Sequence, residues 1–310
     1  AAYYSNLYRQ YATYLTDWSN SSDLYRVASG ASDGNYNWTE VLMKNIPSNL
    51  IEAVALHSYS VIDWGNKGSA TDFSDVQYFQ TMQRAYKMKE YITKHTEIMD
   101  KYDPEKTIDL IIDEWGGWYD VEPGTNPGFL YQQNTMRDAM IAGMTLNLFN
   151  NHAERVKMAN LAQTVNVLQA VILTEGEKLI LTPTYHVLKM YATHQDAQLI
   201  SVNFDPPYFE KMGESLPAIS ISASKDQNDK ISISLVNIDD SKAHEVSLDV
   251  SKLDVAAFEG SILVSNALQD HNDFDNPGVI SPKPLKKVKV KNGMASLQLP
   301  PFSVIVIKEN

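Results

Sequence analysis

One apolar run in this sequence ends in a carboxylate. Residues 108–113 are followed directly by Glu114, with Trp115 and Trp118 just beyond. In parallel α/β folds the reacting groups lie at the carboxyl ends of the strands, and a charge at the end of a buried strand is costly unless it is paired or used. Glu114 is therefore either a catalytic carboxylate or a structural ion-pair partner. Asp113 is its neighbour on the strand, so the two side chains should point to opposite faces and are not expected to form a catalytic pair.

A second apolar run, residues 51–59, ends in His57 and Tyr59. These two residues are two apart, so they should lie on the same face of a strand. A phenol and an imidazole there could orient a carboxylate and bind hydroxyl groups, or both could be hydrogen-bonded core residues. Trp64, in the loop that follows, suits packing better than it suits a platform for a ligand.

A third stretch, residues 159–166, places Gln163 and Asn166 where a strand would end. Amides both donate and accept hydrogen bonds, which suits sugar hydroxyls, although such amides are also ordinary in loops. Metalloprotease, phosphate-loop and serine-hydrolase motifs are missing from the sequence. The seven histidines are scattered, so no metal site is expected.

The elements that must position these residues change character near residue 195. Before it, short apolar runs alternate with helical patterns, which predicts parallel βαβ units. Ser74 and Gln77 form a capping-box pair at the start of a long helix. The expected strands cover residues 24–29, 51–59, 108–113 and 156–162, and the other expected helices cover residues 38–44, 130–150 and 183–191.

After residue 195 the apolar period becomes two. Ile231, Ile233 and Leu235 alternate with Ser232 and Ser234. This alternation predicts an antiparallel sandwich whose sheets each keep one face in water. We therefore expect two domains, residues 1–195 and residues 196–310.

The composition excludes several classes of protein. The 310 residues carry a net charge of −12, which argues against nucleic acid as a partner. No run approaches the roughly 20 apolar residues of a membrane-spanning helix, so no membrane partner is expected. The sequence has no cysteine, which excludes thiolate chemistry and fits either a cytoplasmic or a periplasmic protein.

Several long stretches stand out: LHSY with Trp64 downstream, IIDEWGGWYDVEPGTNPGFLYQQNTMRDA, MANLAQTVNVLQA and ILTEGEKLILTPTYHVLKMY. Together they resemble the family 51 glycoside hydrolases, the α-L-arabinofuranosidases. The resemblance covers about residues 1–195 and the closing LPPFSVIVI. It implies the C-terminal half of a (β/α)8 TIM barrel, strands five to eight, followed by a jelly-roll-like antiparallel β-sandwich.

The resemblance also implies roles for individual residues. Glu114 would be the nucleophile of a retaining mechanism, and Tyr59 would hydrogen-bond it and keep it ionised. No metal or organic cofactor is implied, because carboxylates do the work. His57 and Gln163 would contact the arabinofuranosyl group. Trp64, Trp115 and Trp118 would form the walls of the site.

One part of the family pattern is missing. The acid/base glutamate lies in an Asn-Glu motif at strand four, and nothing in this sequence matches that motif. A retaining glycosidase needs two carboxyl groups about 5–5.5 Å apart, so the isolated chain should be essentially inactive. We expect it to pair with the N-terminal half of the same enzyme or to form a homo-oligomer.

The complete enzyme should release terminal arabinofuranosyl groups from arabinan or arabinoxylan oligosaccharides. The alternative is a non-catalytic carbohydrate-binding or scaffold protein derived from such an enzyme, in which the sandwich is the working part. Tight binding of arabino-oligosaccharides by residues 196–310 alone would favour that alternative.

Overall fold

The computed structural model describes residues 1–18 and 24–309. The chain forms two compact units. The parallel-sheet unit comprises Ala1–Tyr59, Lys87–Trp115 and His152–Leu161, and the sandwich unit comprises Ser60–Tyr86, Gly116–Asn151 and Ala162–Asn310. The predicted division between residues 195 and 196 follows the change in sequence pattern and stays a prediction. Within the described ranges, no helix has the length and apolar character needed to cross a membrane.

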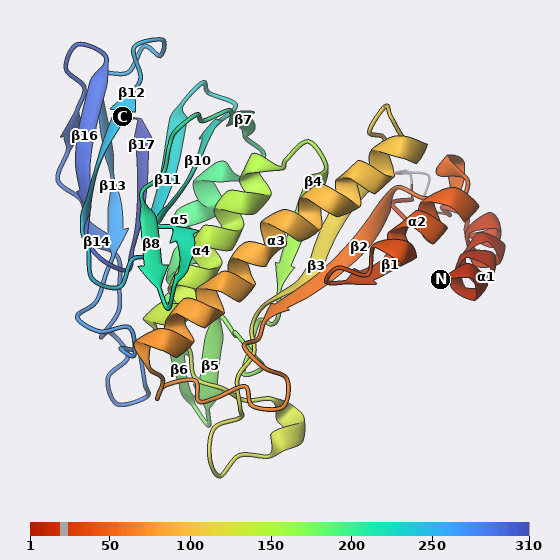
Figure 1. Ribbon diagram of the computed structural model, residues 1–310, viewed down its shortest axis with the longest axis horizontal. Coiled ribbons are helices and arrows are strands. Elements are labelled where there is room, and N and C mark those ends of the chain that lie inside the picture. The colour runs from red at the N-terminus through yellow and green to blue at the C-terminus, as the bar shows by residue number, and fades with distance from the viewer. Residues whose placement is uncertain (19–23, 310) are drawn as a thin grey trace. The chain divides into compact units, whose positions relative to one another are not determined.

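The parallel-sheet unit contains a four-stranded sheet with the order β1-β2-β3-β4 (Figure 1). β1 pairs in parallel with β2, and β3 pairs in parallel with β4, as the βαβ pattern predicts. Residues 53–56 and 110–112 are buried, which is typical of parallel strands covered on both faces. The strands are β1 (Val27–Ser32), β2 (Ala53–Ser60), β3 (Asp109–Gly117) and β4 (Val156–Leu161).

The helices before β3 follow the predicted pattern, apart from the first one. Ser74 and Gln77 form the predicted capping box: Gln77 N donates to Ser74 Oγ, and Ser74 N donates to Gln77 Oε1. The N-terminal helix was not predicted. The helices are α1 (Ala2–Tyr14), α2 (Tyr36–Asn45), the 3-10 turn η1 (Ser48–Leu50) and α3 (Asp75–Tyr102).

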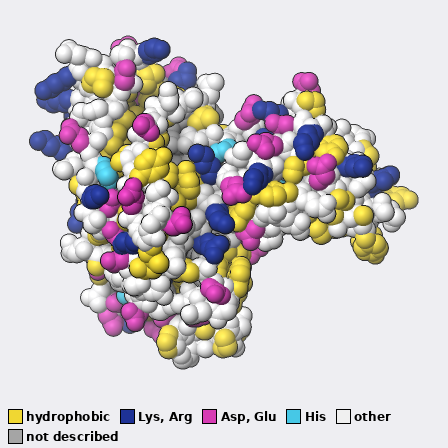
Figure 2. Space-filling model, in the orientation of Figure 1, with side chains coloured by type: hydrophobic (Ala, Val, Ile, Leu, Met, Phe, Trp, Pro, Cys, Tyr) yellow, Lys and Arg dark blue, Asp and Glu magenta, His cyan; other side chains and the backbone are white. Residues whose placement is uncertain are grey.

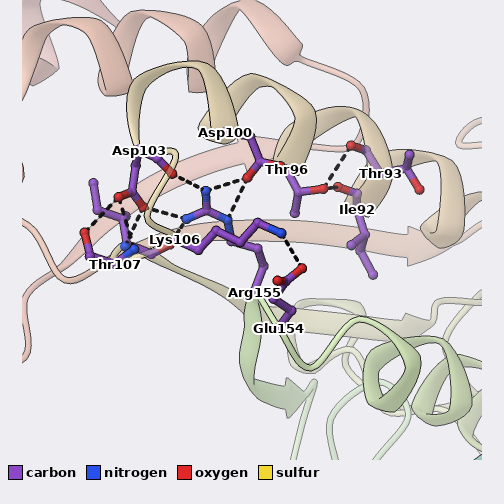
Figure 3. Close-up of polar contacts among 10 residues, drawn as sticks. Ile92, Thr93, Thr96, Asp100, Asp103, Lys106, Thr107, Glu154 and Arg155 are labelled. Atoms are coloured by element: carbon purple, nitrogen blue, oxygen red, sulfur yellow. Dashed lines mark hydrogen bonds and ion pairs between the residues drawn. The ribbon is translucent and has the colours of Figure 1, made fainter. Parts of the chain in front are cut away.

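A buried arginine joins the end of α3 to the start of β4 (Figure 3). The Arg155 side chain is 3% exposed and pairs with Asp103 and Asp100, each at 2.6 Å. It also donates to the backbone oxygens of Ile108 and Asp103. Because Asp103 accepts hydrogen bonds from Thr107 as well, the turn between α3 and β3 is fixed by one polar cluster.

The sandwich unit contributes the remaining helices. Pro183 opens α5 (Pro183–Tyr191), which matches the helix expected over residues 183–191, and the Thr182 side chain accepts a hydrogen bond from Tyr185 N. α4 (Met136–Asn151) begins six residues later than predicted, and Leu130, the first residue of the predicted helix, instead ends a short turn with a left-handed φ of 54°. The turns are η2 (Pro127–Phe129) and η3 (Ala192–His194).

The sandwich itself is an antiparallel structure, as predicted. Its main sheet has the order β14-β13-β17-β11-β10-β7, with β15 also paired to β13. Its strands are β7 (Gln198–Ile200), β10 (Ile219–Lys225), β11 (Ile231–Asn237), β13 (Ala257–Leu263), β14 (Lys283–Pro284), β15 (Val288–Lys289) and β17 (Ser303–Glu309).

Three two-stranded sheets accompany the main sheet. β12 and β16 face it across an apolar core that includes Phe258, Leu299 and Ile305. The hairpins β5–β6 and β8–β9 were not predicted. The strands are β12 (His244–Asp249), β16 (Met294–Leu299), β5 (Ile172–Glu175), β6 (Lys178–Leu181), β8 (Tyr208–Lys211) and β9 (Glu214–Pro217).

The prediction of one wet face per sheet is wrong for the main sheet. Every residue of β11 is buried, including Ser232 and Ser234. Ser234 Oγ and Ser222 Oγ both donate to Asn147 Oδ1 of α4, at 2.6 and 2.9 Å. Ser222 and Ser234 therefore face α4 rather than water, and the Ser232 hydroxyl lies 2.6 Å from the Thr193 hydroxyl of η3.

Candidate active site

The end of β3 carries a β-bulge at its two carboxylates. Ile112 pairs with Ala159 and Trp115 pairs with Leu161, so three steps along β3 match two steps along β4. One extra residue is therefore inserted in β3 at Asp113–Glu114, which re-aims the side chains on either side. Asp113 is exposed, Glu114 is partly exposed and Trp115 is buried.

Two donors from β2 meet the Glu114 carboxylate. The Tyr59 hydroxyl donates to Glu114 Oε1, and His57 Nδ1 lies 2.8 Å from Glu114 Oε2. Burial, followed by the hydrogen bond to Glu114, raises the pKa of the Tyr59 phenol. Tyr59 therefore keeps its proton and acts as a donor to the carboxylate throughout the neutral range.

His57 also contacts Asp113, with Nε2 2.9 Å from Asp113 Oδ1. The expectation that Asp113 and Glu114 point to opposite faces is therefore wrong, because the bulge breaks the strict alternation of the strand. Both carboxylates reach the same imidazole ring. The two adjacent glycines, Gly116 and Gly117, are a sequence signal for such an irregularity.

A polar network fixes the backbone behind His57. The amide of Asp33, at the end of β1, donates to His57 O at 2.8 Å, and Ser58 Oγ donates to the Asp33 carboxylate at 2.7 Å. His95 Nε2 lies 2.8 Å from Asp33 O, and burial lowers the pKa of His95. The Asp33 carboxylate and backbone amide thus join the end of β1 to the end of β2.

In the sandwich unit, two buried amides hold the last residue of β3. Gly117 N donates to Gln169 Oε1 at 2.6 Å, and Gln132 Nε2 donates to Gly117 O at 3.2 Å. Gln132 Oε1 also accepts from Tyr119 N at 2.8 Å. Sequence reasoning did not single out either glutamine, because no spacing rule separates a buried amide that binds backbone from an exposed one.

The other predicted site residues differ in their surroundings. The rings of Trp64 and Trp118 meet edge to face at 5.4 Å, whereas Trp115 is 1% exposed. Gln163 is exposed and lines a hollow of about 580 Å³ together with Phe129 and other residues of the sandwich unit. The roles given to these four residues by the family resemblance stay predictions.

The chemistry available at the β3 bulge is that of an oriented carboxylate. The Tyr59 hydroxyl donates to one oxygen of Glu114 and the His57 ring contacts the other, so the carboxylate is held in position and the donated hydrogen bond stabilises its charge. A carboxylate held in this way can attack an electrophilic carbon. In residues 1–18 and 24–309, no cluster of three or more histidine, aspartate or glutamate side chains is arranged to hold a metal ion.

Comparison with known proteins identifies the class. The chain is 40% identical to the GH51 arabinofuranosidase from Xanthomonas axonopodis pv. citri, with a TM-score of 0.96 over 99% of this chain and 62% of that one. The fold is also that of the thermostable GH51 α-L-arabinofuranosidase from Thermotoga petrophila, at 22% identity and a TM-score of 0.81, over 100% of this chain and 62% of that one. These neighbours are glycoside hydrolases of family 51.

The sequence relatives agree with this class. An intracellular exo-α-L-arabinofuranosidase of Bacteroides ovatus is 42% identical over 99% of this chain and 60% of its own length. The model of the α-L-arabinofuranosidase C-terminal domain matches residues 113–303. The chain belongs to this family and is a C-terminal portion of the family 51 type, as its sequence motifs predicted. It spans about three fifths of the length of these relatives.

Proposed function

We propose that this chain carries the nucleophile of a retaining, exo-acting α-L-arabinofuranosidase. The observation that supports this most directly is the Glu114 carboxylate at the end of β3, held by the Tyr59 hydroxyl and the His57 ring. The similarity to the intracellular exo-α-L-arabinofuranosidase of Bacteroides ovatus supports the same activity. The substrate class is then oligosaccharides with terminal arabinofuranosyl groups, as in arabinan and arabinoxylan.

In this mechanism, an oxygen of Glu114 attacks the anomeric carbon of the terminal sugar. The bond to the leaving oxygen breaks while a second carboxyl group donates a proton to that oxygen. A covalent glycosyl ester of Glu114 forms, and water activated by the same second group hydrolyses it. Tyr59 and His57 keep the attacking carboxylate ionised and aimed.

The second carboxyl group is proposed to come from the N-terminal half of the same enzyme. The four parallel strands would be strands five to eight of a (β/α)8 barrel, and that half would supply strands one to four. The surface of α1 supports such a partner, because Tyr3, Tyr11 and Tyr14 are 80%, 69% and 86% exposed. Figure 2 shows hydrophobic side chains gathered over this helix, at the right of the view.

The test is complementation. The chain is co-expressed with the part of the Bacteroides ovatus relative that it does not match, and hydrolysis of an aryl α-L-arabinofuranoside is followed. We expect turnover only when both pieces are present. Glu114→Ala in the reconstituted enzyme should lower kcat by about 10⁴-fold or more, because the covalent step is lost.

Two controls separate loss of chemistry from loss of assembly. Size-exclusion chromatography should give the same complex for Glu114→Ala as for the unchanged chain. Azide should restore turnover to Glu114→Ala, because a small anion can occupy the space left by the missing carboxylate. Equal rates for Glu114→Ala and the unchanged chain would contradict the proposal.

A further inference from the structure

The β3 bulge leaves one carboxylate, that of Asp113, outside the mechanism above. Asp113 Oδ1 lies 2.9 Å from His57 Nε2, while His57 Nδ1 lies 2.8 Å from Glu114 Oε2. The side chains of His57, Asp113 and Glu114 are 39%, 37% and 35% exposed, respectively. The imidazole therefore stands between two partly shielded carboxylates, with one ring nitrogen on each.

The two contacts restrict the number of protons that the His57 ring can carry. A carboxylate oxygen only accepts hydrogen bonds, whereas a neutral imidazole has one N–H and one bare nitrogen. Two acceptor atoms do not approach to 2.8–2.9 Å without a proton between them. Both contacts of His57 are therefore satisfied together when both ring nitrogens carry protons.

We propose that Asp113 is a positioning residue that holds His57 as an imidazolium, so that Nδ1–H is always directed at Glu114. A neutral ring has a single proton, which could sit on either Nδ1 or Nε2, so Glu114 would not always receive a hydrogen bond. Asp113 removes this choice by accepting from Nε2 itself. The description of Glu114 as a nucleophile rests on the proposed function, whereas the proton count rests on the two contacts and on both carboxyl groups being ionised.

The groups that face His57 agree with a positive ring. Asp113 and Glu114 contact it from β3, and Tyr59, two residues along β2, has its hydroxyl committed to Glu114. At the end of β1, Asp33 accepts from Ser58 through its carboxylate and donates to His57 O through its backbone. An imidazolium between Asp113 and Glu114 compensates two neighbouring negative charges.

Nitrogen-15 NMR of the 310-residue chain, labelled at histidine, reports the protons on each ring nitrogen directly. The signals of the His57 ring nitrogens are assigned as those that disappear in His57→Gln. Asp113→Asn removes the charge and keeps the shape, and Asp113→Glu keeps the charge. Asp109→Asn is the matched control, because Asp109 lies on the same strand and its side chain accepts from Tyr25 instead. Asp113→Ser replaces Asp113→Asn if the asparagine variant does not fold.

At pH 7 we expect both His57 nitrogens to be protonated in the unchanged chain, in Asp113→Glu and in Asp109→Asn. Asp113→Asn should lose one of the two ring protons. A neutral His57 ring in the unchanged chain, or two retained protons in Asp113→Asn, would overturn the proposal. The spectra need no substrate, so they decide the state of the ring even where the complemented enzyme shows no turnover.

The complemented enzyme supplies the second readout. Asp113→Asn should lower kcat about tenfold with KM within about twofold, because it weakens one charge-assisted hydrogen bond to the reacting carboxylate. Asp113→Glu should recover most of that loss, and Asp109→Asn should match the unchanged enzyme. An unchanged kcat in Asp113→Asn, with turnover present, would count against Asp113 alone. Absence of turnover in every variant would count against the proposed function.

Discussion

At the scale of residues, the site depends on two donors that converge on one carboxylate. Tyr59 and His57 lie two apart on β2, and Glu114 lies at the bulge of β3. The phenol stays protonated because burial and the bond to Glu114 raise its pKa. A nucleophile is most effective when it is ionised and fixed, and this pair of donors provides both conditions.

Removing the phenol hydroxyl tests this arrangement. Tyr59→Phe in the complemented enzyme should lower kcat by about 10- to 100-fold, which corresponds to roughly 1.5–3 kcal/mol for a hydrogen bond to a charged group. KM should change little, because the contact is with the proposed nucleophile. Steady-state kinetics on an aryl α-L-arabinofuranoside measures both constants. Tyr25→Phe is the matched control, since Tyr25 bonds to Asp109 instead, and an equal loss of kcat there would contradict the assignment.

Spacing and the family resemblance together predicted most of the contacts around Glu114, but not the position of Asp113. The two-residue spacing of His57 and Tyr59 places them on one face of a strand, and the hydrogen bond between Tyr59 and Glu114 was predicted from the family resemblance. Asp113 was assigned to the opposite face, because alternation is the default for a strand. A bulge adds one residue to the register and depends on the partner strand, so single-strand periodicity cannot locate it.

At the scale of elements, the Arg155 cluster joins α3, β3 and β4. Arg155→Ala should lower the free energy of unfolding by about 3–5 kcal/mol, because it leaves buried carboxylate and backbone oxygens unpaired. Urea unfolding followed by circular dichroism measures the change. Lys106→Ala is the neighbouring control, since its partner Glu154 is 70% exposed and such pairs contribute less than about 1 kcal/mol. Similar losses in the two variants would contradict this view.

The same cluster predicts a pH dependence. Burial alone would raise the pKa of Asp103, but hydrogen bonds from Ile108, Arg155 and Thr107 outweigh burial and lower it. A lowered pKa stabilises the folded state above the unfolded value of about 3.9, and the contribution is lost as the pH falls through the folded value. Asp103→Asn should therefore have a lower free energy of unfolding than the unchanged chain at pH 7. Urea melts should show that this difference in free energy, the stability gap, becomes smaller below about pH 4. A constant gap would contradict the lowered pKa.

At the scale of the whole molecule, the sequence separates the parallel and antiparallel regions but misjudges which faces are covered. Period two correctly predicts antiparallel strands at Ile219–Lys225 and Ile231–Asn237. Ser234 was assigned to water because it alternates with apolar residues. It is buried instead, because its hydroxyl donates to Asn147 on α4, as does the hydroxyl of Ser222 on the neighbouring strand. That partner lies far away in the sequence, so no local pattern reveals it.

This coverage bears on whether residues 196–310 can stand alone. Removing the preceding chain takes away α4 and α5, including Asn147 and Tyr191, whose hydroxyl also donates to Asn147 Oδ1 at 3.0 Å. It also removes Gly143, where an added methyl carbon would come within 2.8 Å of Val236, so the helix packs closely on β11. The fragment would then expose the mixed sheet face, with Ser222, Ser234 and Val236, that α4 covers.

We therefore expect the fragment 196–310 to unfold at lower urea and with a broader transition than residues 60–310, and to bind a hydrophobic dye before unfolding. The comparison needs urea melts followed by circular dichroism and dye fluorescence on both fragments. Asn147→Ala in the longer fragment should move its midpoint in the same direction, because each hydroxyl left unpaired costs about 1–3 kcal/mol. A sharp transition of the short fragment at the midpoint of the longer one would show that the sandwich is independent of α4.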